Sequence, residues 1–126
     1  MVTWRLALLV FVGGGLGSVL RFLVGRWVSN FYENHFPLAT LLANVTACFL
    51  MGCFVGAADQ RNWLSPDARV FWTVGFCGGF STFSAFSNET LVLLQGDHIP
   101  TALLYLLFST AFCLAATWGG WYLMRG

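Results

Sequence analysis

Lysine is absent from the sequence, and residues of either charge are scarce. The 126 residues include five acidic side chains and six arginines, so 9% of the chain is charged and the formal net charge is +1. Soluble domains carry about 25% charged residues, and this composition excludes a soluble globular protein. The arginines are spread along the chain, and without a basic patch we do not expect a nucleic-acid partner.

The sequence also lacks the residue patterns of metal centres and catalytic sites. Its four cysteines lie in apolar runs, and none belongs to a CxxC pair or to the Cys/His spacing of a zinc site. We interpret them as small hydrophobic side chains, with Cys113 able to join a polar stripe. The sequence shows no carboxylate pair and no nucleophile placed beside a base, so we do not expect an enzyme.

Long apolar runs take up most of the chain. Hydrophobic residues make up 58% of it, and the mean hydropathy is +0.74. Because a helix needs about 20 apolar residues to cross a bilayer core, these runs predict spans at residues 4–30, 37–58, 69–95 and 99–124. Residues 1–126 are therefore predicted to form one all-α integral membrane domain of four transmembrane helices. A signal peptide is the alternative for the first run, but no A-x-A motif follows it.

The stretch from Gly75 to Glu89 is unusual for a membrane helix. It contains two adjacent glycines, Gly78 and Gly79, and glycine weakens a helix by about 1 kcal/mol relative to alanine. These glycines predict that the third helix is broken at its centre. Backbone groups freed by such a break must be buried in protein or must face an ion or water pathway.

Two rows of side chains follow the glycines at intervals of three residues. They comprise Phe80, Phe83 and Phe86, and beside them Ser81, Ser84 and Ser87. Ring edges are electropositive and hydroxyls donate hydrogen bonds, so the rows suit an anion without supplying a fixed positive charge. The alternative is aromatic packing with serines bonded to their own backbone. Both rows together, after a double glycine, favour a pathway.

Polar residues in the predicted spans each have two interpretations. Arg21 either faces protein or extends to the membrane interface. Asn44 either joins two helices through a hydrogen bond or offers its amide to a passing ion. Glu89 is either a solvated charge at a helix end or a carboxylate at the mouth of a pathway. The last span carries a polar stripe at intervals of four residues, comprising Thr101, Tyr105, Ser109, Cys113 and Thr117.

Glycine and arginine positions indicate how helices and chains associate. The GxxxG pairs Gly13–Gly17 and Gly52–Gly56 let helices approach closely. The predicted spans place Arg5, Arg61, Arg69 and Arg125 on one side of the membrane, and Arg26, with Arg21 near it, on the other. This weak imbalance permits insertion in both orientations. Since four helices are few for a complete pore, we expect an antiparallel, dual-topology dimer.

Three motifs resemble those of the Fluc/CrcB family of fluoride channels. They are GGLGSVLR at residues 14–21, TLLAN at 40–44 and GFCGGFSTFSAFS at 75–87. The resemblance covers the four-span chain. It implies a passive, fluoride-selective channel of the bacterial inner membrane, which exports cytoplasmic fluoride and relieves its toxicity. It also implies an antiparallel homodimer with two pores.

The resemblance implies a set of site residues as well. Those along or beside the fluoride path are Asn44, Phe83, Phe86, Ser84, Tyr105 and Ser109. Backbone carbonyls of Gly78 and Ser81 from both subunits would hold a structural Na⁺ on the dimer axis. The family usually has Thr where Ser81 stands, a change that a backbone ligand tolerates. Cys113 stands where relatives often have Ser or Thr.

Two other functions are alternatives. A proton-coupled small multidrug exporter also has about four spans and dual topology, but it needs an ionisable group within the membrane. No acidic residue lies in the first two predicted spans, and Glu89 lies near the end of the third. A subunit that only docks a larger partner through its GxxxG pairs would leave the phenylalanine and serine rows unexplained.

Overall fold

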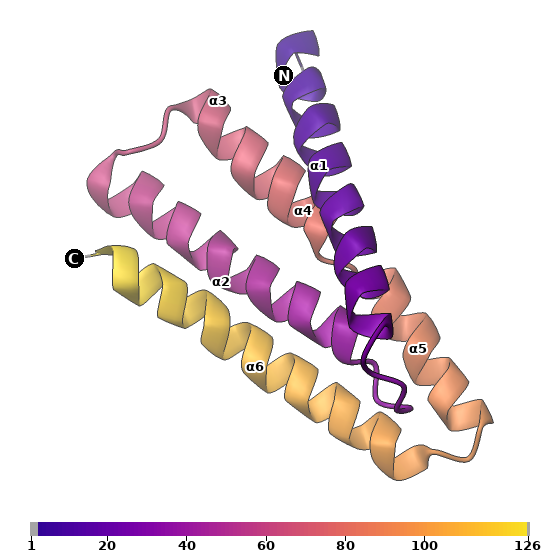
Figure 1. Cartoon of the computed structure of the whole chain (residues 1–126). Coiled ribbons are helices and arrows are strands. Elements are labelled where there is room, and N and C mark those ends of the chain that lie inside the picture. Colours follow the sequence, from indigo (N-terminus) through magenta and orange to yellow (C-terminus); the bar gives the residue numbers. More distant parts are fainter. Residues whose placement is uncertain (1–2, 126) are drawn as a thin grey trace.

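The chain forms a bundle of helices, and the residues described include no strand. The computed structural model describes residues 3–125, so residues 1–2 and 126 of the predicted domain lie outside the described residues. In order, the elements are α1 (Trp4–Ser29), α2 (Leu38–Arg61), α3 (Pro66–Arg69), the π-helix η1 (Val70–Cys77), α4 (Gly78–Phe80), α5 (Phe83–Gln95) and α6 (Ile99–Arg125) (Figure 1). Helices suit so apolar a chain because each satisfies its own backbone hydrogen bonds.

Three of the helices are long and apolar enough to cross a membrane. They are α1, α2 and α6, with 26, 24 and 27 residues, and each contains a window of mean hydropathy 1.9 to 2.0. Their bounds agree with three of the predicted spans to within a few residues. Only 11% to 22% of each window is buried inside the chain. Most of this apolar surface is therefore left for lipid or for another protein chain.

The third predicted span is divided at its centre, as predicted, but not at the two glycines expected to cause the break. Its first part runs through α3, η1 and α4, and its second part is α5 (Figure 1). Between them Ser81 and Thr82 are extended, with ψ angles of 159° and 123°. Gly78 and Gly79 are both helical. The prediction of a break at these two glycines is therefore wrong, and the break follows them.

Glycines serve the packing of α1 against the first half of this span. A Cβ on Gly79 would collide with the backbone of Gly14, and one on Gly13 would lie 2.7 Å from the Phe71 carbonyl oxygen. A Cβ on Gly17 would likewise collide with the backbone of η1. The predicted role of the first GxxxG pair in close helix approach is confirmed.

The break also separates the predicted rows of side chains. Phe80 ends α4 and is buried in a cluster with α2, whereas Phe83 and Phe86 lie in the first turn of α5 with ring centroids 5.4 Å apart. Ser81 is likewise separated from the two later serines, which are exposed on α5. The prediction of two continuous rows is therefore wrong, because extended backbone interrupts the helical spacing on which it relied.

Helices α2 and α6 lie side by side and run in the same direction (Figure 1). Their contacts repeat every four residues on both helices, since a Cβ on Gly52 would collide with Thr117 and one on Gly56 would meet Trp121. Following this register back toward the start of both helices pairs Cys48 with Cys113, Asn44 with Ser109, and Thr40 with Tyr105. The polar stripe predicted on the last span thus faces a stripe of the same spacing on α2.

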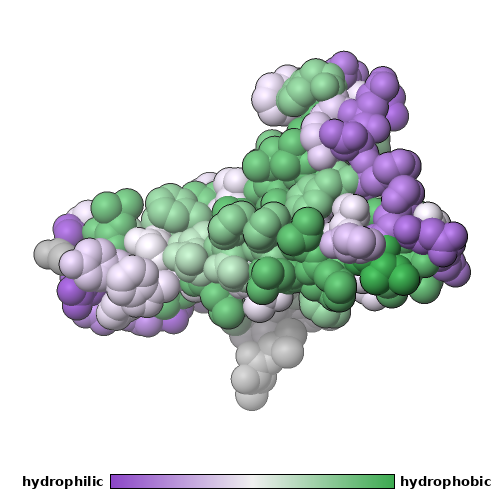
Figure 2. All heavy atoms as spheres, turned by 90° about the horizontal axis from the view of Figure 1, so that it is seen from below, coloured by the Kyte–Doolittle hydropathy of each residue, from purple (hydrophilic) through white to green (hydrophobic). Residues whose placement is uncertain are grey.

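Hydrophilic side chains gather at the ends of the helices. Figure 2 shows hydrophobic side chains over the middle of the molecule and hydrophilic ones toward its ends. At one end Arg5 pairs with Asp67, Arg69 pairs with Asp59, and Arg61 donates to a carbonyl in the last turn of α6, the turn that contains Arg125. The predicted grouping of these four arginines on one side is confirmed.

At the opposite end, the loop before α2 covers the start of α6. The ring of His35 stacks on that of His98 with centroids 4.0 Å apart, and Phe36 meets Tyr105 edge to face at 5.5 Å. These contacts close the bundle beyond the break in the third span.

Candidate functional site: a cavity at the helix break

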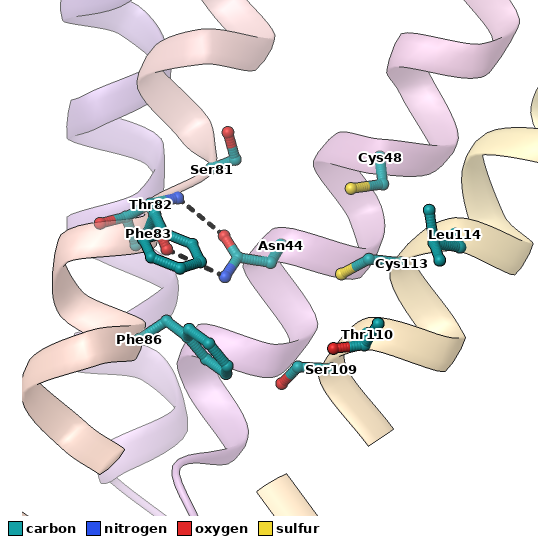
Figure 3. Close-up of a pocket in the computed structure, with 10 residues that line it drawn as sticks. All are labelled: Asn44, Cys48, Ser81, Thr82, Phe83, Phe86, Ser109, Thr110, Cys113 and Leu114. Atoms are coloured by element: carbon teal, nitrogen blue, oxygen red, sulfur yellow. Dashed lines mark hydrogen bonds between the residues drawn. The ribbon is translucent and has the colours of Figure 1, made fainter. Parts of the chain in front are cut away.

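A cavity of about 350 Å³ lies beside the break in the third span. It is bounded by α2, by the break with the start of α5, and by α6, and it is open on one side (Figure 3). Its lining residues are Asn44, Cys48, Ser81, Thr82, Phe83, Phe86, Ser109, Thr110, Cys113 and Leu114. None of these carries a formal charge, so the cavity offers hydrogen-bond donors, aromatic ring edges and thiols.

Asn44 fixes the broken backbone at the cavity wall. The Thr82 N–H donates to its Oδ1 at 2.8 Å, and its Nδ2 donates to the Thr82 carbonyl at 3.1 Å (Figure 3). The predicted hydrogen bond joining two segments is therefore confirmed. Since a side-chain amide has two N–H groups and this pair uses one, Asn44 also keeps a donor at the wall of the cavity.

The first turn of α5 contributes backbone to the same wall. Thr82 is the N-cap residue, and its hydroxyl accepts a hydrogen bond from the Ala85 N–H at 3.1 Å. The first N–H groups of a helix have no partner within it, and they carry the positive end of the helix dipole. Because Thr82 and Phe83 both line the cavity, this electropositive end lies at its edge.

Ser109 presents an unpartnered hydroxyl. Its side chain is only 7% exposed, and no hydrogen-bond partner for its Oγ is found among the described residues. The neighbouring Thr110 hydroxyl, by contrast, donates to the Leu106 carbonyl at 2.9 Å. A buried polar group without a partner costs stability. The Ser109 hydroxyl is therefore available to a molecule or ion that enters the cavity.

Phe83 and Phe86 form the aromatic side of the cavity. Phe83 is 78% exposed in the single chain. Phe86 is half-buried, and its ring packs against that of Tyr105 with centroids 4.9 Å apart. The Asn44 amide lies beside Phe83 at the break, and Ser109 faces Phe86 from α6 (Figure 3), so an entering ion would meet both ring edges and hydrogen-bond donors.

Tyr105 and Ser84 lie beside the cavity and do not line it. Tyr105 is fully buried, and its hydroxyl donates to the Glu89 carboxylate at 2.9 Å; Thr40 donates to the other carboxylate oxygen, also at 2.9 Å. Ser84 is exposed and shares a hydrogen bond of 3.2 Å with the Thr82 hydroxyl. The interpretation of Glu89 as a solvated helix-end charge is wrong, because it is half-buried and held by two hydroxyls.

The break leaves the Gly78 and Ser81 carbonyls without their helical partners. In a continuous α-helix the Thr82 N–H would bond to the Gly78 carbonyl, and the Ala85 N–H to the Ser81 carbonyl. The first donates to Asn44 instead, and the second to the Thr82 hydroxyl. Gly78 and Ser81 are the residues whose carbonyls the sequence resemblance assigned to a cation.

The Gly79 carbonyl is engaged by α1. The Ser18 hydroxyl and the Arg21 Nε both donate to it at 3.4 Å, which is long for a hydrogen bond. Arg21 is half-buried. Of its two interpretations, the structure bears out the one in which it faces protein.

Sequence reasoning assigned no role to four lining residues, Cys48, Thr82, Thr110 and Leu114. Cys48 could have been found, because Thr40, Asn44 and Cys48 repeat the interval of four that marked the last span. Thr110 and Leu114 each follow a member of that stripe by one residue. Nothing in the sequence distinguishes them from lipid-facing neighbours.

The freed backbone and the donor-lined cavity lie among helices that are long enough to span a bilayer. This arrangement defines a multi-pass membrane protein of the channel or transporter class. The chain belongs to the CrcB family. The family model described as "CrcB-like protein, Camphor Resistance (CrcB)" matches residues 8–121.

Curated relatives resemble the chain over nearly its full length. The "Fluoride-specific ion channel FluC" of Flavobacterium psychrophilum is 44% identical over 111 residues, which are 88% of this chain and 90% of the relative. The protein of the same name from Azobacteroides pseudotrichonymphae is 43% identical over 112 residues, again 88% and 90% of the two chains. The one from Anaeromyxobacter dehalogenans is 40% identical over 118 residues, or 94% of each.

Proposed function

We infer that this chain is a fluoride-specific ion channel and not an enzyme. The observation that carries the inference is the similarity of about 40% or more, over nearly the whole length, to proteins named for fluoride-specific conduction. The neutral, donor-lined cavity supports it. These relatives come from bacteria, so the inner membrane is the place that fits a multi-pass protein of this kind.

Fluoride passes along the neutral cavity wall. It is a small, strongly hydrated anion, so its water shell must be replaced by hydrogen-bond donors. Binding must also stay weak enough for the ion to leave, which argues against a fixed cation in the narrow path. The spare Asn44 N–H, the unpartnered Ser109 hydroxyl and the first N–H groups of α5 meet both conditions.

The aromatic side chains of α5 supply a further part of the wall of the path. The edges of the Phe83 and Phe86 rings are electropositive and can face a dehydrated anion. Tyr105 positions Phe86 through ring contact, and its hydroxyl is held by Glu89. Ser84 lies at the exposed edge of α5, next to the path.

A structural Na⁺ binds the carbonyls of Gly78 and Ser81 from two copies of the chain. Both carbonyls lose their helical donors at the break, and oxygen ligands suit a hard cation. Gly78 is exposed on the surface of the single chain, where a second copy can reach it. The cation would neutralise the carbonyl dipoles that meet at the break.

Two copies associate in antiparallel orientation, and the divided third span completes the fourth crossing in each. The large exposed apolar surface of the single chain supports association. One face of α1, which includes Phe11 and Leu16, is hollowed into an apolar groove of about 540 Å³. Phe83 is also exposed at the edge of the cavity. A second copy would cover these surfaces and close the open side of the path.

Such a channel lets cytoplasmic fluoride leave passively and relieves its toxicity. A proton-coupled multidrug exporter is not favoured. Its coupling would need a carboxylate free to exchange protons and bind a cation, whereas both Glu89 oxygens accept hydrogen bonds from hydroxyls.

Anion efflux from liposomes tests the function. Liposomes that contain only the purified protein are loaded with potassium fluoride or potassium chloride. Valinomycin is then added, so that potassium ions can leave with the anion and balance its charge. We expect rapid fluoride efflux and no chloride efflux. Failure to release either anion, from protein shown to be folded, would overturn the inferred function, and equal release of both would overturn its selectivity.

A further inference from the structure

Two cysteines line the cavity and have no role in the proposed fluoride contacts. Cys48 lies one turn after Asn44 on α2, and Cys113 lies one turn after Ser109 on α6. The two thiols lie on facing helices that run in the same direction, with Cys48 further along the pair than Cys113 (Figure 3). Both residues line the cavity, and both sulfur atoms point into it (Figure 3).

We propose that Cys48 and Cys113 form a two-coordinate site for a soft metal ion, and that a metal ion bound there blocks fluoride. The blocking effect rests on the proposed function of the cavity. Thiolates select soft metals. Zinc prefers four ligands, and among the described residues no other cysteine and no His, Asp or Glu lines this cavity. Ions that accept two thiolates in a line, such as Hg²⁺ and Cu⁺, therefore fit the site.

Mercuric chloride is the appropriate probe, because it enters the apolar interior as a neutral molecule. Two S–H bonds and two Hg–Cl bonds break, and two S–Hg bonds form. The two protons leave to water with the two chloride ions. Mercury and sulfur keep their oxidation states, so the reaction needs no oxidant. The product carries no net charge, which suits a site within the membrane, where an isolated charge is costly.

A metal ion at this position obstructs the cavity without helping the anion. It lies one turn from the Asn44 and Ser109 donors and joins α2 to α6 across the space between them. Fluoride is a hard ligand, and it gains little from a soft metal whose two preferred positions are already filled. The other two cysteines, Cys53 and Cys77, do not line the cavity.

Two double variants separate the pair from the other thiols. C53A/C77A keeps only the proposed site, and C48A/C113A keeps only the other cysteines. Each is reconstituted in liposomes, treated with mercuric chloride, washed with a monothiol such as 2-mercaptoethanol, and compared with its own untreated fluoride efflux. Attachment through two sulfurs raises the effective affinity by about 100-fold or more over attachment through one. We therefore expect block to survive washing only in wild type and C53A/C77A.

Single variants and intact mass complete the test. In C48A and in C113A, each made in the C53A/C77A background, the metal is held by one thiol, so washing should restore efflux. In wild type, the washed protein should retain one mercury and lose two hydrogens. Block that persists in C48A/C113A would overturn the site, and retained mercury with full efflux would overturn the block. Absence of efflux before treatment would instead contradict the proposed function, while the mass measurement would still test the metal site.

Discussion

At the scale of a single residue, the surroundings of the Ser109 hydroxyl indicate a functional role and not a structural one. It is buried and unpartnered, while the adjacent Thr110 hydroxyl is bonded to its own helix. A group kept for stability would be expected to have a partner. A donor for a transient ion would not, because its partner is present only while the ion passes.

Ser109→Ala should lower fluoride efflux without weakening the fold. Loss of a hydrogen bond to a charged species costs about 1.5 to 3 kcal/mol, which corresponds to a decrease of about tenfold or more in efflux. Removal of an unsatisfied hydroxyl should leave the free energy of unfolding unchanged or raise it by up to about 1 kcal/mol. Liposome efflux and thermal unfolding in detergent measure the two quantities.

The matched control is Thr110→Val, which changes a hydroxyl that also lines the cavity but already has an acceptor. Its efflux should stay within a few-fold of wild type. If Ser109→Ala were destabilised and kept normal efflux, Ser109 would be a packing residue.

Phe86→Ile should abolish fluoride passage and leave the proposed dimer intact. Isoleucine roughly keeps the buried volume but has no electropositive ring edge. The exposed change Phe31→Ile, in the loop after α1, is the control for loss of an aromatic ring and should conduct normally. Liposome efflux and cross-linking of the purified protein are the measurements. Normal efflux in Phe86→Ile, with the dimer confirmed, would rule out the aromatic wall as part of the path.

At the scale of elements, the break in the third span depends on a side chain from another helix. The Asn44 side chain of α2 forms hydrogen bonds with both the N–H and the carbonyl of Thr82. The Thr82 hydroxyl in turn caps α5. The extended residues therefore keep their hydrogen bonds although they have left the helix.

Asn44→Ala should destabilise the fold as well as reduce efflux. Both Thr82 backbone groups would lose their partners, and each unsatisfied buried group costs about 1 to 3 kcal/mol. A loss of about 2 to 4 kcal/mol in the free energy of unfolding is expected, measured by denaturation in detergent. Asn88→Ala, on the exposed face of α5, should change stability by less than about 0.5 kcal/mol. Equal stability of the two variants would show that Asn44 does not hold the break.

Adjacent glycines on α6 test the parallel packing of α2 and α6. A Cβ on Gly120 would collide with the Phe49 carbonyl and crowd Cys53, whereas one on Gly119 would meet nothing within 4 Å. Gly119→Ala should raise stability by up to about 1 kcal/mol through helix propensity. Gly120→Ala should lower it by about 1 to 3 kcal/mol through overpacking. Thermal unfolding measures the stability of both variants, and similar effects of the two substitutions would contradict the close approach of α6 to α2.

The sequence was sufficient to predict the helical spans because hydropathy and helix length are local properties. It also predicted the polar stripe on α6, since an interval of four residues already defines a helix face. The break was misplaced because tertiary contacts set its position. Gly79 serves the close approach of Gly14, and Asn44 selects Thr82 as the extended residue. Neither partner could be identified from the stretch itself.

Only part of the candidate site could be predicted from the sequence, because the rest of it also depends on tertiary contacts. Asn44 and Ser109 stand out as polar residues in apolar spans, and the phenylalanines stand out by their spacing. The burial of Glu89 between Thr40 and Tyr105 could not be predicted, because it requires the register of α2 against α6. That register is set by glycine contacts, which appear in the sequence only as a GxxxG pair.

For the whole molecule, the distribution of charge is compatible with both orientations in the membrane. Four arginines lie at one end, but Arg5 and Arg69 are paired with aspartates, and only Arg26 lies at the far end of α1. Orientation depends on the excess of arginine and lysine on the cytoplasmic side. A bias this small should be reversible by a few surface substitutions, which makes the antiparallel dimer testable in cells.

Two oppositely biased variants should be inactive alone and active together. R26Q/Q60R places every exposed arginine at one end, and R61Q/R125Q/N30R/N34R moves the excess to the other. These positions are exposed, so the fold should persist. Each variant would insert in one orientation only, and identical orientations cannot form an antiparallel pair. In bacteria that lack a fluoride exporter, co-expression should restore fluoride tolerance, and wild type, inserted both ways, should need no helper. Full tolerance from either variant alone would refute the antiparallel dimer, because a chain with one fixed orientation would then build a complete path by itself.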